Sequence, residues 1–517
     1  MLARLSASAV VGVDAVPVSV EVDVSPGLPG MTMVGLPDTT VRESRDRVRT
    51  AIRNSGFPYP PDRITVSLAP ADVRKVGAAF DLPIALGILA AAGLLPHREQ
   101  RGYTIVGGLS LDGSIPPMRG LLPIAVAARR ASGALLFPAT NLAEAGIVEG
   151  LRLHPVGTLF EAARLLCQES PAPAEAPAPL PMETEALLDD LADVRGQAAG
   201  RRALEIAAAG AHHLLFSGPP GAGKTMLARR LGGLLPPLSM DEALAVTAIH
   251  SVAGHLEAGR GLIRSRPFRA PHHTCSDIAL VGGGSVPRPG ELSLAHGGVL
   301  FLDELPEFSR RVLETLRQPL EQGTVHIARA ARAVTFPAQV MLVGAMNPCP
   351  CGYYGQEERA CRCPAGEIGR YRRRLSGPLR DRFDLGLELP SVTWSDMRGA
   401  ASGESTAVVR SRVIDARARQ FVRQGCLNGR LEGRALQEHC ALADTRAEIL
   451  LGRGVTRLKL SARAVTRVHR VARTLADLEG VVRPGRTHVA EALQFRLPDR
   501  QFEAENTGHD RAAVLRF

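Results

Sequence analysis

The chain has few aromatic residues and lacks long hydrophobic runs. Only 4% of its 517 residues are Phe, Trp or Tyr, and one tryptophan is present. No uninterrupted apolar run approaches the roughly 18 residues that would predict a membrane-spanning helix. Near the N-terminus, the alternating valines from Val16 to Val24 predict a strand rather than a secretory signal. The sequence alone therefore favours a cytoplasmic protein without a membrane partner.

Lysine is nearly absent, so arginine carries the positive charge. The lysines are Lys75, Lys224 and Lys459, and the formal net charge is +10. Codon bias explains the choice of arginine over lysine, but it does not explain the excess over acidic residues. That excess, concentrated in the C-terminal part, suits an anionic partner such as nucleic acid. Because aromatic side chains are scarce, base stacking is disfavoured, and any DNA contact would be sequence-independent and sensitive to salt.

The sequence divides into three domains, a linker and a tail. Residues 1–166 mix strand-like alternation with helix-like stretches, which predicts an α/β domain. Residues 167–190 are rich in Pro and Ala, which is typical of an exposed linker. A second α/β domain covers residues 191–392, a helical domain covers 393–502, and the tail 503–517 lacks periodicity. The predicted fold class is α/β with a helical C-terminal domain.

A glycine-rich segment lies between an apolar run and a helix-like stretch. It consists of Gly218, Pro219, Pro220, Gly221, Ala222, Gly223, Lys224 and Thr225. In such a P-loop, backbone N–H groups surround phosphates, the lysine reaches the β- and γ-phosphates, and the hydroxyl binds Mg²⁺. The segment predicts a site for ATP and Mg²⁺, with Lys224 in a catalytic role and Thr225 as a metal ligand.

Two further apolar strands end in polar residues. Residues 299–302 precede Asp303 and Glu304, and residues 340–346 precede Asn347. We expect Asp303 to join the Mg²⁺ shell and Glu304 to polarise the attacking water. An amide at Asn347 can orient that water against the γ-phosphate, the role known as sensor 1.

Arginines in the second half of the chain are candidates for contacts with the γ-phosphate. Arg380 and Arg382 precede a predicted strand, and an arginine finger at such a place is often supplied by a neighbouring subunit. Arg463 follows Ser461, a predicted helix cap, and suits a sensor-2 contact. The same helix carries Arg463, Arg467, Arg470 and Arg473 on one face. Phosphate contact and a solvated face are equally compatible with that spacing.

Four of the eight cysteines are clustered. Cys349, Cys351, Cys361 and Cys363 form two C-x-C pairs separated by nine residues. In a reducing compartment such a cluster favours tetrahedral Zn²⁺ over disulfides. An iron–sulfur cluster and redox-labile thiols are the alternatives. With four thiolates, the zinc site would be structural rather than catalytic.

Several motifs together resemble the magnesium-chelatase-like AAA+ ATPases, especially the ComM/YifB branch. They are DVRGQ at 193–197, the P-loop, FRAPHHT at 268–274, GVLFLDELPEF at 298–308, NPCPCGYYG at 347–355 and SARAVTRVHRVARTLADLEG at 461–480. The resemblance covers nearly the whole chain and implies a hexameric ring with nucleotide between subunits. Because Asp381 and Phe383 flank Arg382 as in this family, Arg382 rather than Arg380 is the expected finger.

The resemblance also implies a route for DNA. The alternation in residues 321–336 predicts a hairpin, and a hairpin before sensor 1 points a basic residue into the pore of related ring helicases. Arg329 and Arg332 are therefore candidate DNA contacts, and solvated arginines on a surface hairpin are the alternative.

The N-terminal domain resembles the Lon-protease-type domain, a variant of the ribosomal-protein-S5-like fold, through residues 69–81 and 107–120. Lon-type proteases use a serine activated by a lysine. By the resemblance, those positions fall near Ala79 and Ala128, so the domain is expected to be an inactive collar that assists assembly or guides DNA.

The resemblance implies an ATP-driven DNA motor. Its expected activity is that of a helicase that promotes branch migration during recombination and natural transformation, acting on single-stranded or branched DNA. The alternative is a chelatase-like or protein-remodelling ATPase that does not act on DNA. The N-terminal domain and the cysteine cluster argue against a chelatase subunit, and the arginines of the hairpin argue against an unfoldase.

Overall fold

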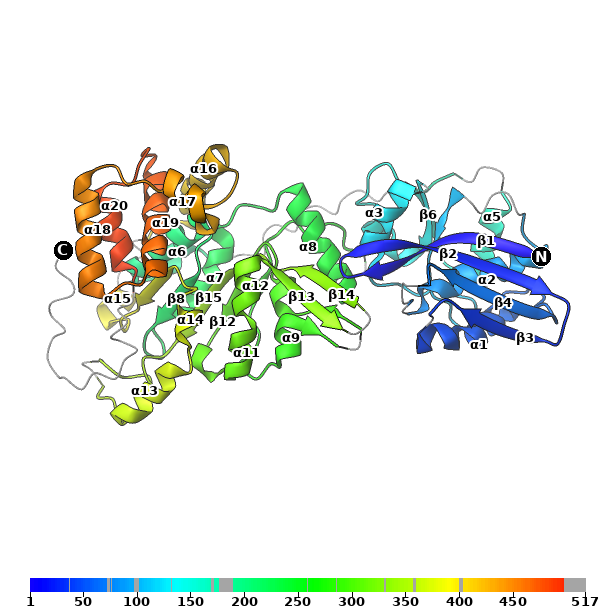
Figure 1. The fold of residues 1–517 in the computed structure, drawn as a ribbon, viewed down its shortest axis with the longest axis horizontal. Coiled ribbons are helices and arrows are strands. Elements are labelled where there is room, and N and C mark those ends of the chain that lie inside the picture. Colours follow the sequence, from blue (N-terminus) through cyan, green and yellow to red (C-terminus); the bar gives the residue numbers. More distant parts are fainter. Residues whose placement is uncertain are drawn as a thin grey trace.

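The computed structural model combines two α/β units with a bundle of C-terminal helices, as the sequence predicts. It describes residues 1–36, 38–71, 75, 77–96, 102–131, 133–168, 172–175, 189–257, 259–284, 286–329, 332–356, 359–398 and 403–496. Figure 1 shows the N-terminal sheet at one end of an elongated molecule, the central sheet in the middle and the helices at the other end. The expected tail, 503–517, and most of the expected linker, 167–190, lie outside the described residues.

The N-terminal unit is a seven-stranded mixed sheet in the order β3-β4-β2-β1-β5-β6-β7. Its strands are β1 (Leu2–Val11), β2 (Asp14–Ser25), β3 (Gly30–Val34), β4 (Arg63–Ala69), β5 (Thr104–Ile105), β6 (Ala134–Pro138) and β7 (Arg152–Val156). The helices are α1 (Thr39–Asn54), α2 (Asp81–Ala91), α3 (Leu121–Ala131), α4 (Leu142–Ala145) and α5 (Leu159–Leu166). Buried and exposed residues alternate along β1, so one face of this strand packs into the core.

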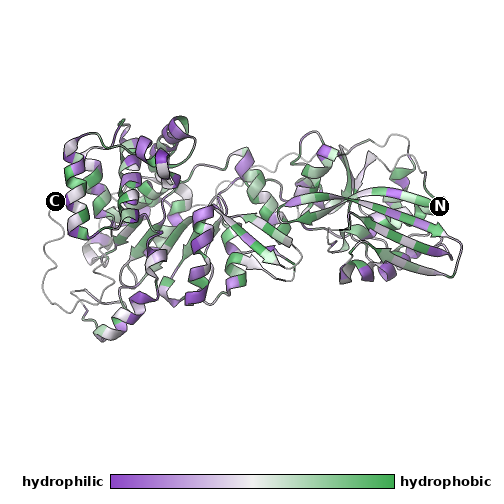
Figure 2. Ribbon diagram, in the orientation of Figure 1, coloured by the Kyte–Doolittle hydropathy of each residue, from purple (hydrophilic) through white to green (hydrophobic). Residues whose placement is uncertain are grey.

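The central unit is a five-stranded parallel sheet in the order β16-β8-β15-β12-β9. Its strands are β8 (Leu214–Ser217), β9 (Phe268–Arg269), β12 (Val299–Leu302), β15 (Met341–Met346) and β16 (Leu385–Glu388). The helices that follow or precede them include α6 (Ala198–Gly210), α7 (Lys224–Leu234) and α8 (Met240–Ala253). Figure 2 shows hydrophobic residues gathered on these strands. In a parallel sheet all carboxyl ends share one edge, where ligands bind.

An insert and a hairpin flank this sheet. The insert contains α9 (Asp277–Val281), β10 (Gly282–Gly283), β11 (Arg288–Pro289) and α10 (Glu291–Leu294), and α11 (Arg310–Thr315) and α12 (Arg317–Gln322) lead to the hairpin. The predicted hairpin is confirmed: β13 (Thr324–Arg329) pairs with β14 (Arg332–Pro337) in antiparallel register. Val325, Ile327 and Phe336 anchor it in a hydrophobic cluster that also contains Leu280 of the insert. Arg329 and Arg332 pair at the end of the hairpin, and their side chains lie outside the described residues.

The C-terminal part is helical. After α13 (Ala365–Arg373), α14 (Gly377–Arg380) and α15 (Trp394–Arg398) come α16 (Thr406–Gln424), α17 (Gly433–His439), α18 (Thr445–Leu458), α19 (Ala462–Glu479) and α20 (Arg486–Gln494). Ser461 caps α19 as predicted, because its side chain accepts a hydrogen bond from the Ala464 N–H. None of the helices that the structure describes is both long and apolar enough to cross a bilayer.

The arginine face of α19 is solvated only in part, because Arg463 is exposed but two of the other three arginines are not. Arg467 and Arg473 are buried, not solvated. Arg473 pairs with Asp477 one turn along the helix, and Arg467 lies 3.4 Å from the Asp384 carboxylate. The helix faces acidic groups from the core and from its own next turn, which a spacing pattern cannot reveal.

The N-terminal unit contacts the central unit through α8 and the hairpin. Ser251 on α8 donates its hydroxyl to the buried Glu144 carboxylate, and its carbonyl accepts the Gly120 N–H at 3.2 Å. At the β1–β2 turn, Gly12 packs against Val334 of β14. The N-terminal unit therefore reaches the hairpin that carries the candidate DNA contacts.

Candidate functional site

The P-loop joins the carboxyl end of β8 to the start of α7. Gly223 caps this helix with φ +86°, a left-handed conformation that glycine adopts without steric cost. Lys224 and Thr225 follow as the first residues of the helix. The backbone N–H groups of the first helical turn have no partner within the helix, which makes this terminus suited to phosphate.

Lys224 links the P-loop to the end of β15. Its Nζ donates to the carbonyl oxygens of Gly218 at 2.7 Å and Pro219 at 2.9 Å, and to Asn347 Oδ1 at 2.9 Å. Burial lowers the pKa of Lys224, although the charges of Asp303 and Glu304 oppose that shift. The sequence-predicted lysine and amide are thus in direct contact.

The two residues predicted to bind Mg²⁺ also meet. The Thr225 hydroxyl donates to Asp303 Oδ2 at 2.7 Å, and the Glu304 N–H donates to Asp303 Oδ1 at 2.9 Å. Hydroxyl and carboxylate oxygens are the ligands that Mg²⁺ prefers. The residues present therefore fit the ion, because Thr225, after β8, and Asp303, after β12, meet at the carboxyl edge of the sheet.

Glu304 has a partner that the sequence did not reveal. His273 Nδ1 lies 3.1 Å from Glu304 Oε2, and the His273 ring packs edge-on against Phe308. Glu304 has φ +50°, which is uncommon for a residue with a side chain. His273 comes from the FRAPHHT segment, 268–274, so this family motif reaches the predicted catalytic glutamate.

Gln197 is a second residue whose role the sequence did not reveal. Its amide nitrogen donates to the Ala222 carbonyl in the P-loop at 3.1 Å and to the Pro390 carbonyl after β16 at 2.8 Å. Gln197 therefore fastens the P-loop to the neighbouring strand. The DVRGQ motif singles out Gln197 in the sequence, but a motif alone does not show which groups its residues contact.

The four cysteines come together after β15. The sulfur atoms of Cys349, Cys351, Cys361 and Cys363 all lie within 4.8 Å of one another, and Cys349 Sγ is 3.4 Å from Cys351 Sγ and 3.6 Å from Cys361 Sγ. Four thiolates around zinc at about 2.3 Å would place sulfur atoms roughly 3.8 Å apart. Backbone N–H groups of Tyr353 and Arg362 lower the pKa of Cys351 to about 6, which favours the thiolate. The cluster fits Zn²⁺.

The cysteine loop supports the P-loop from outside. A Cβ at Gly352 would lie 2.5 Å from Pro220 Cδ, so only glycine allows the two loops to approach this closely. Arg372 on α13 holds the loop on its other side, donating to the Pro348 carbonyl at 3.0 Å and stacking over Tyr354. A metal at the cysteines would therefore stabilise one wall of the P-loop.

Arg382 and Arg463 lie at the opposite edge of the sheet. Both line a cavity at the amino ends of the strands, together with His213 before β8 and Asp384 before β16. β8 has four residues, about 13 Å at the usual rise of a strand, and separates this edge from the P-loop. Arg382 is buried and ion-paired with Glu321, whereas Arg463 is exposed. The structure does not bring either arginine to the P-loop of its own chain.

Family comparisons cover most of the chain. The family described as "Magnesium chelatase, subunit ChlI" matches residues 190–397. "Subunit ChlI of Mg-chelatase" matches residues 20–141, and "Magnesium chelatase, subunit ChlI C-terminal" matches residues 403–496.

Several bacterial relatives match the chain over nearly its full length. YifB of Salmonella typhimurium is 46% identical, covering 96% of this chain and 98% of that protein. The competence protein ComM of Haemophilus influenzae is 43% identical, covering 96% and 97%. A "Probable DNA helicase" of Arabidopsis thaliana is 26% identical over 35% of this chain and 23% of its own length. The chain belongs to the ComM/YifB family of magnesium-chelatase-like AAA+ ATPases.

Proposed function

We propose that this protein is an ATP-driven, ring-forming DNA motor, acting as a helicase that promotes branch migration during recombination and natural transformation. The observation that supports ATP hydrolysis is that residues at the carboxyl ends of three strands, β8, β15 and β12, contact one another. Lys224 contacts Asn347, and Thr225 contacts Asp303, at the carboxyl edge of one parallel sheet. These are the groups that phosphoryl transfer requires at one place.

Each of these side chains has a distinct task in the proposal. Lys224 and the P-loop N–H groups bind the phosphates, and Thr225 and Asp303 hold Mg²⁺, which neutralises phosphate charge when bound. Glu304 accepts the proton of the attacking water, and Asn347 orients that water. His273 holds Glu304 by a side-chain contact of 3.1 Å that must open before Glu304 can reach the water.

The hydrolytic site is proposed to be completed by a neighbouring subunit. Arg382 and Arg463 lie at the amino edge of the sheet, away from the P-loop of the same chain. A ring in which each amino edge faces the next P-loop would bring both arginines to the neighbour's γ-phosphate. Arg382 would leave Glu321 when it takes this role. In a closed hexamer, every P-loop would face the arginines of one neighbouring subunit.

The proposal for DNA rests on the hairpin and on the relatives. Arg329 and Arg332 pair at the end of β13 and β14, in a hairpin that packs against the insert that follows His273. A full-length relative is named a competence protein, and a partial relative is named a DNA helicase. Backbone contact through arginine suits sequence-independent binding.

A chelatase-like ATPase that does not act on DNA is the second candidate. The names of all three matching families favour it. The cysteine cluster and the near full-length match to ComM favour the DNA motor.

The test is the ATPase rate of the full chain with and without forked or four-way DNA, at low and moderate salt. Lys224→Ala is the inactive control. Stimulation by DNA that declines with salt, together with movement of the branch, is the expected result. A rate indifferent to every DNA would overturn the DNA role and leave hydrolysis to a chelatase-like or protein-remodelling function.

A further inference from the structure

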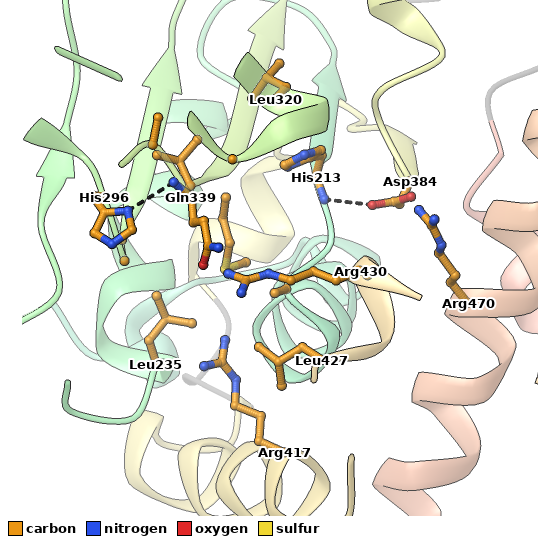
Figure 3. Close-up of a pocket in the computed structure, with 18 of the residues that line it drawn as sticks. His213, Leu235, His296, Leu320, Gln339, Asp384, Arg417, Leu427, Arg430 and Arg470 are labelled. Atoms are coloured by element: carbon orange, nitrogen blue, oxygen red, sulfur yellow. Dashed lines mark hydrogen bonds between the residues drawn. The ribbon is translucent and has the colours of Figure 1, made fainter. Parts of the chain in front are cut away.

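A large cavity lies between the amino edge of the central sheet and the C-terminal helices. Its volume is about 1410 Å³, which exceeds that of ordinary small-molecule pockets. Figure 3 shows the side chains that enter it from the core strands and from the helices. The P-loop residues do not line it, so the cavity is distinct from the nucleotide site described above.

The charges of the lining do not balance. Seven arginines and four carboxylates face the cavity, and each carboxylate is already matched by one arginine. On the core side, Glu242 lies 2.9 Å from Arg266, and Glu321 pairs with Arg382.

The other two carboxylates are matched in the same way. Asp384 lies 3.4 Å from Arg467, and Glu432 lies 3.5 Å from Arg470. Arg470 also donates to the Leu431 carbonyl at 2.7 Å. Among the described residues, three of the seven arginines therefore have no carboxylate in ion-pair contact: Arg417, Arg430 and Arg463.

Two of these three converge on the same part of the cavity. Arg417 on α16 is only 7% exposed, and its Nε donates to the Ala208 carbonyl at 2.8 Å. Within the described part of the chain, its terminal nitrogens have no hydrogen-bond or ion-pair partner. The same is true of the guanidinium of Arg430, which follows α16 in a short turn, Asn428–Arg430. Figure 3 shows both guanidinium groups pointing into one hollow, near Leu235 and Leu427.

The surroundings of Arg417 disfavour its positive charge. Burial, together with the charges of Arg266 and Arg430, lowers the pKa of Arg417 to about 9, although Glu242 opposes that shift. Partial desolvation also lowers the pKa of Arg430, although this residue as a whole is exposed to solvent. Because arginine remains protonated in proteins, the hollow keeps an excess of positive charge that an anion would relieve.

We propose that Arg417 and Arg430 form a second phosphate-binding site, separate from the P-loop, for a polyphosphate of nucleotide size. Two unrestrained guanidinium groups offer the planar pairs of N–H donors that phosphate oxygens accept. The phosphates could belong to a free nucleotide or to the nucleotide held by a neighbouring subunit. The site does not depend on hydrolysis or on DNA binding by this protein.

The experiment measures binding of inorganic tripolyphosphate and of ATP to the full-length Lys224→Ala chain by calorimetry. Saturable binding is expected to weaken at least about tenfold when Arg430→Gln is added, because charge-assisted hydrogen bonds are lost. Arg453→Gln, which removes the same charge from an exposed position outside the cavity, should leave binding unchanged. Arg417→Gln provides the same comparison for the buried partner, with circular dichroism to verify folding.

The outcomes of this experiment show whether the phosphates come from a free nucleotide or from the nucleotide of a neighbouring subunit. Tripolyphosphate binding by Lys224→Ala that depends on Arg430 identifies a site for free nucleotide. If Lys224→Ala binds neither probe but Arg430→Gln raises the KM for ATP in the otherwise unchanged ring, the phosphates belong to the neighbour. Unchanged binding and unchanged KM in both arginine variants would overturn the proposal. Loss of ring assembly with unchanged phosphate binding would also overturn it, because the arginines would then pair with acidic residues of the neighbour.

Discussion

At the scale of single residues, the contact between His273 and Glu304 is the most consequential for the proposed chemistry. Glu304 lies in a left-handed conformation, and its carboxylate is 3.1 Å from His273. A carboxylate held in an ion pair is less available as a base than a free one. His273 also begins the segment that leads into the insert and from there to the hairpin. If DNA binding moves the hairpin, the movement could therefore change the contact between His273 and Glu304.

Replacing His273 by Ala should raise the ATPase rate in the absence of DNA and reduce stimulation by DNA. The ion pair is partly exposed, so the expected rise is modest, up to about fivefold, the equivalent of roughly 1 kcal/mol. Steady-state assays should show the change in kcat rather than in KM. His272→Ala is the comparison variant: the exposed His272 side chain bonds to Thr274 and stacks on the His273 ring, and among the described residues it makes no contact with Glu304. A fall in the DNA-free rate would contradict the holding role.

Glu304→Gln should abolish hydrolysis but preserve ATP binding. The amide is nearly isosteric with the carboxylate but cannot accept the proton of water, and removal of a general base typically costs about 10²–10⁴ in rate. Single-turnover hydrolysis and equilibrium binding of ATP would separate the two effects. Loss of ATP binding along with hydrolysis would mean that Glu304 supports the metal site instead.

At the scale of secondary structure elements, two half-buried histidines secure the amino ends of the central strands. His213 precedes β8 and accepts the Leu342 N–H at 3.0 Å, and His296 precedes β12 and accepts the Gln339 N–H at 3.0 Å. Both acceptors require a neutral ring nitrogen. Burial lowers the pKa of each histidine to about 4.

The protein should therefore lose stability as the pH falls from about 6.5 to about 4. Between these values the unfolded chain binds protons at His213 and His296 that the folded chain excludes, so the free energy of unfolding decreases with falling pH. The loss is at most about 3 kcal/mol for each histidine. Melting temperatures measured across this range should show a smaller decline for His213→Asn, whose side chain can accept the N–H without titrating. An equal decline in that variant would remove His213 from the explanation.

The cysteine loop acts at the same scale, because it supports the P-loop through Gly352 and Pro220. Metal removal by a chelator, or Cys351→Ser, should lower the melting temperature and raise the KM for ATP. The purified protein should release about one zinc per chain. Cys426→Ser, outside the cluster, should change neither quantity. A metal-free native preparation with an ordinary melting temperature would contradict the zinc assignment.

At the scale of the whole molecule, we propose that the two edges of the central sheet supply complementary halves of a hydrolytic site. The carboxyl edge carries Lys224 and Asp303, and the amino edge carries Arg382 and Arg463. Among the described residues, the N-terminal unit contacts α8 and the hairpin. This arrangement suits a collar that leaves both edges open to neighbouring subunits.

Arg382→Ala should lower hydrolysis by about a thousandfold or more, with ATP binding largely intact. Mixing Arg382→Ala chains with Lys224→Ala chains should restore activity, because random assembly completes about a quarter of the interfaces. The mixture is assayed against each variant alone at equal total protein. If mixing restores nothing although mixed rings form, Arg382 does not act on the neighbour's nucleotide.

Much of the site could be predicted from the sequence because its elements are local. The P-loop, the acidic end of β12 and the amide end of β15 each depend on a strand followed by a few polar residues. Parallel pairing of those strands then brings Lys224, Asp303 and Asn347 to one edge. The hairpin followed from its alternation, and the cysteine cluster followed from its spacing.

The sequence by itself determined the family, the α/β class and the residues at the carboxyl edge, because each depends on short patterns or on likeness along the chain. The tertiary structure alone decided the partners of the charged side chains. The pairing of Arg382 with Glu321 and of His273 with Glu304, and the burial of Arg467, join segments far apart in the chain. The strength of such a contact depends on which groups share a buried environment, and only packing determines this.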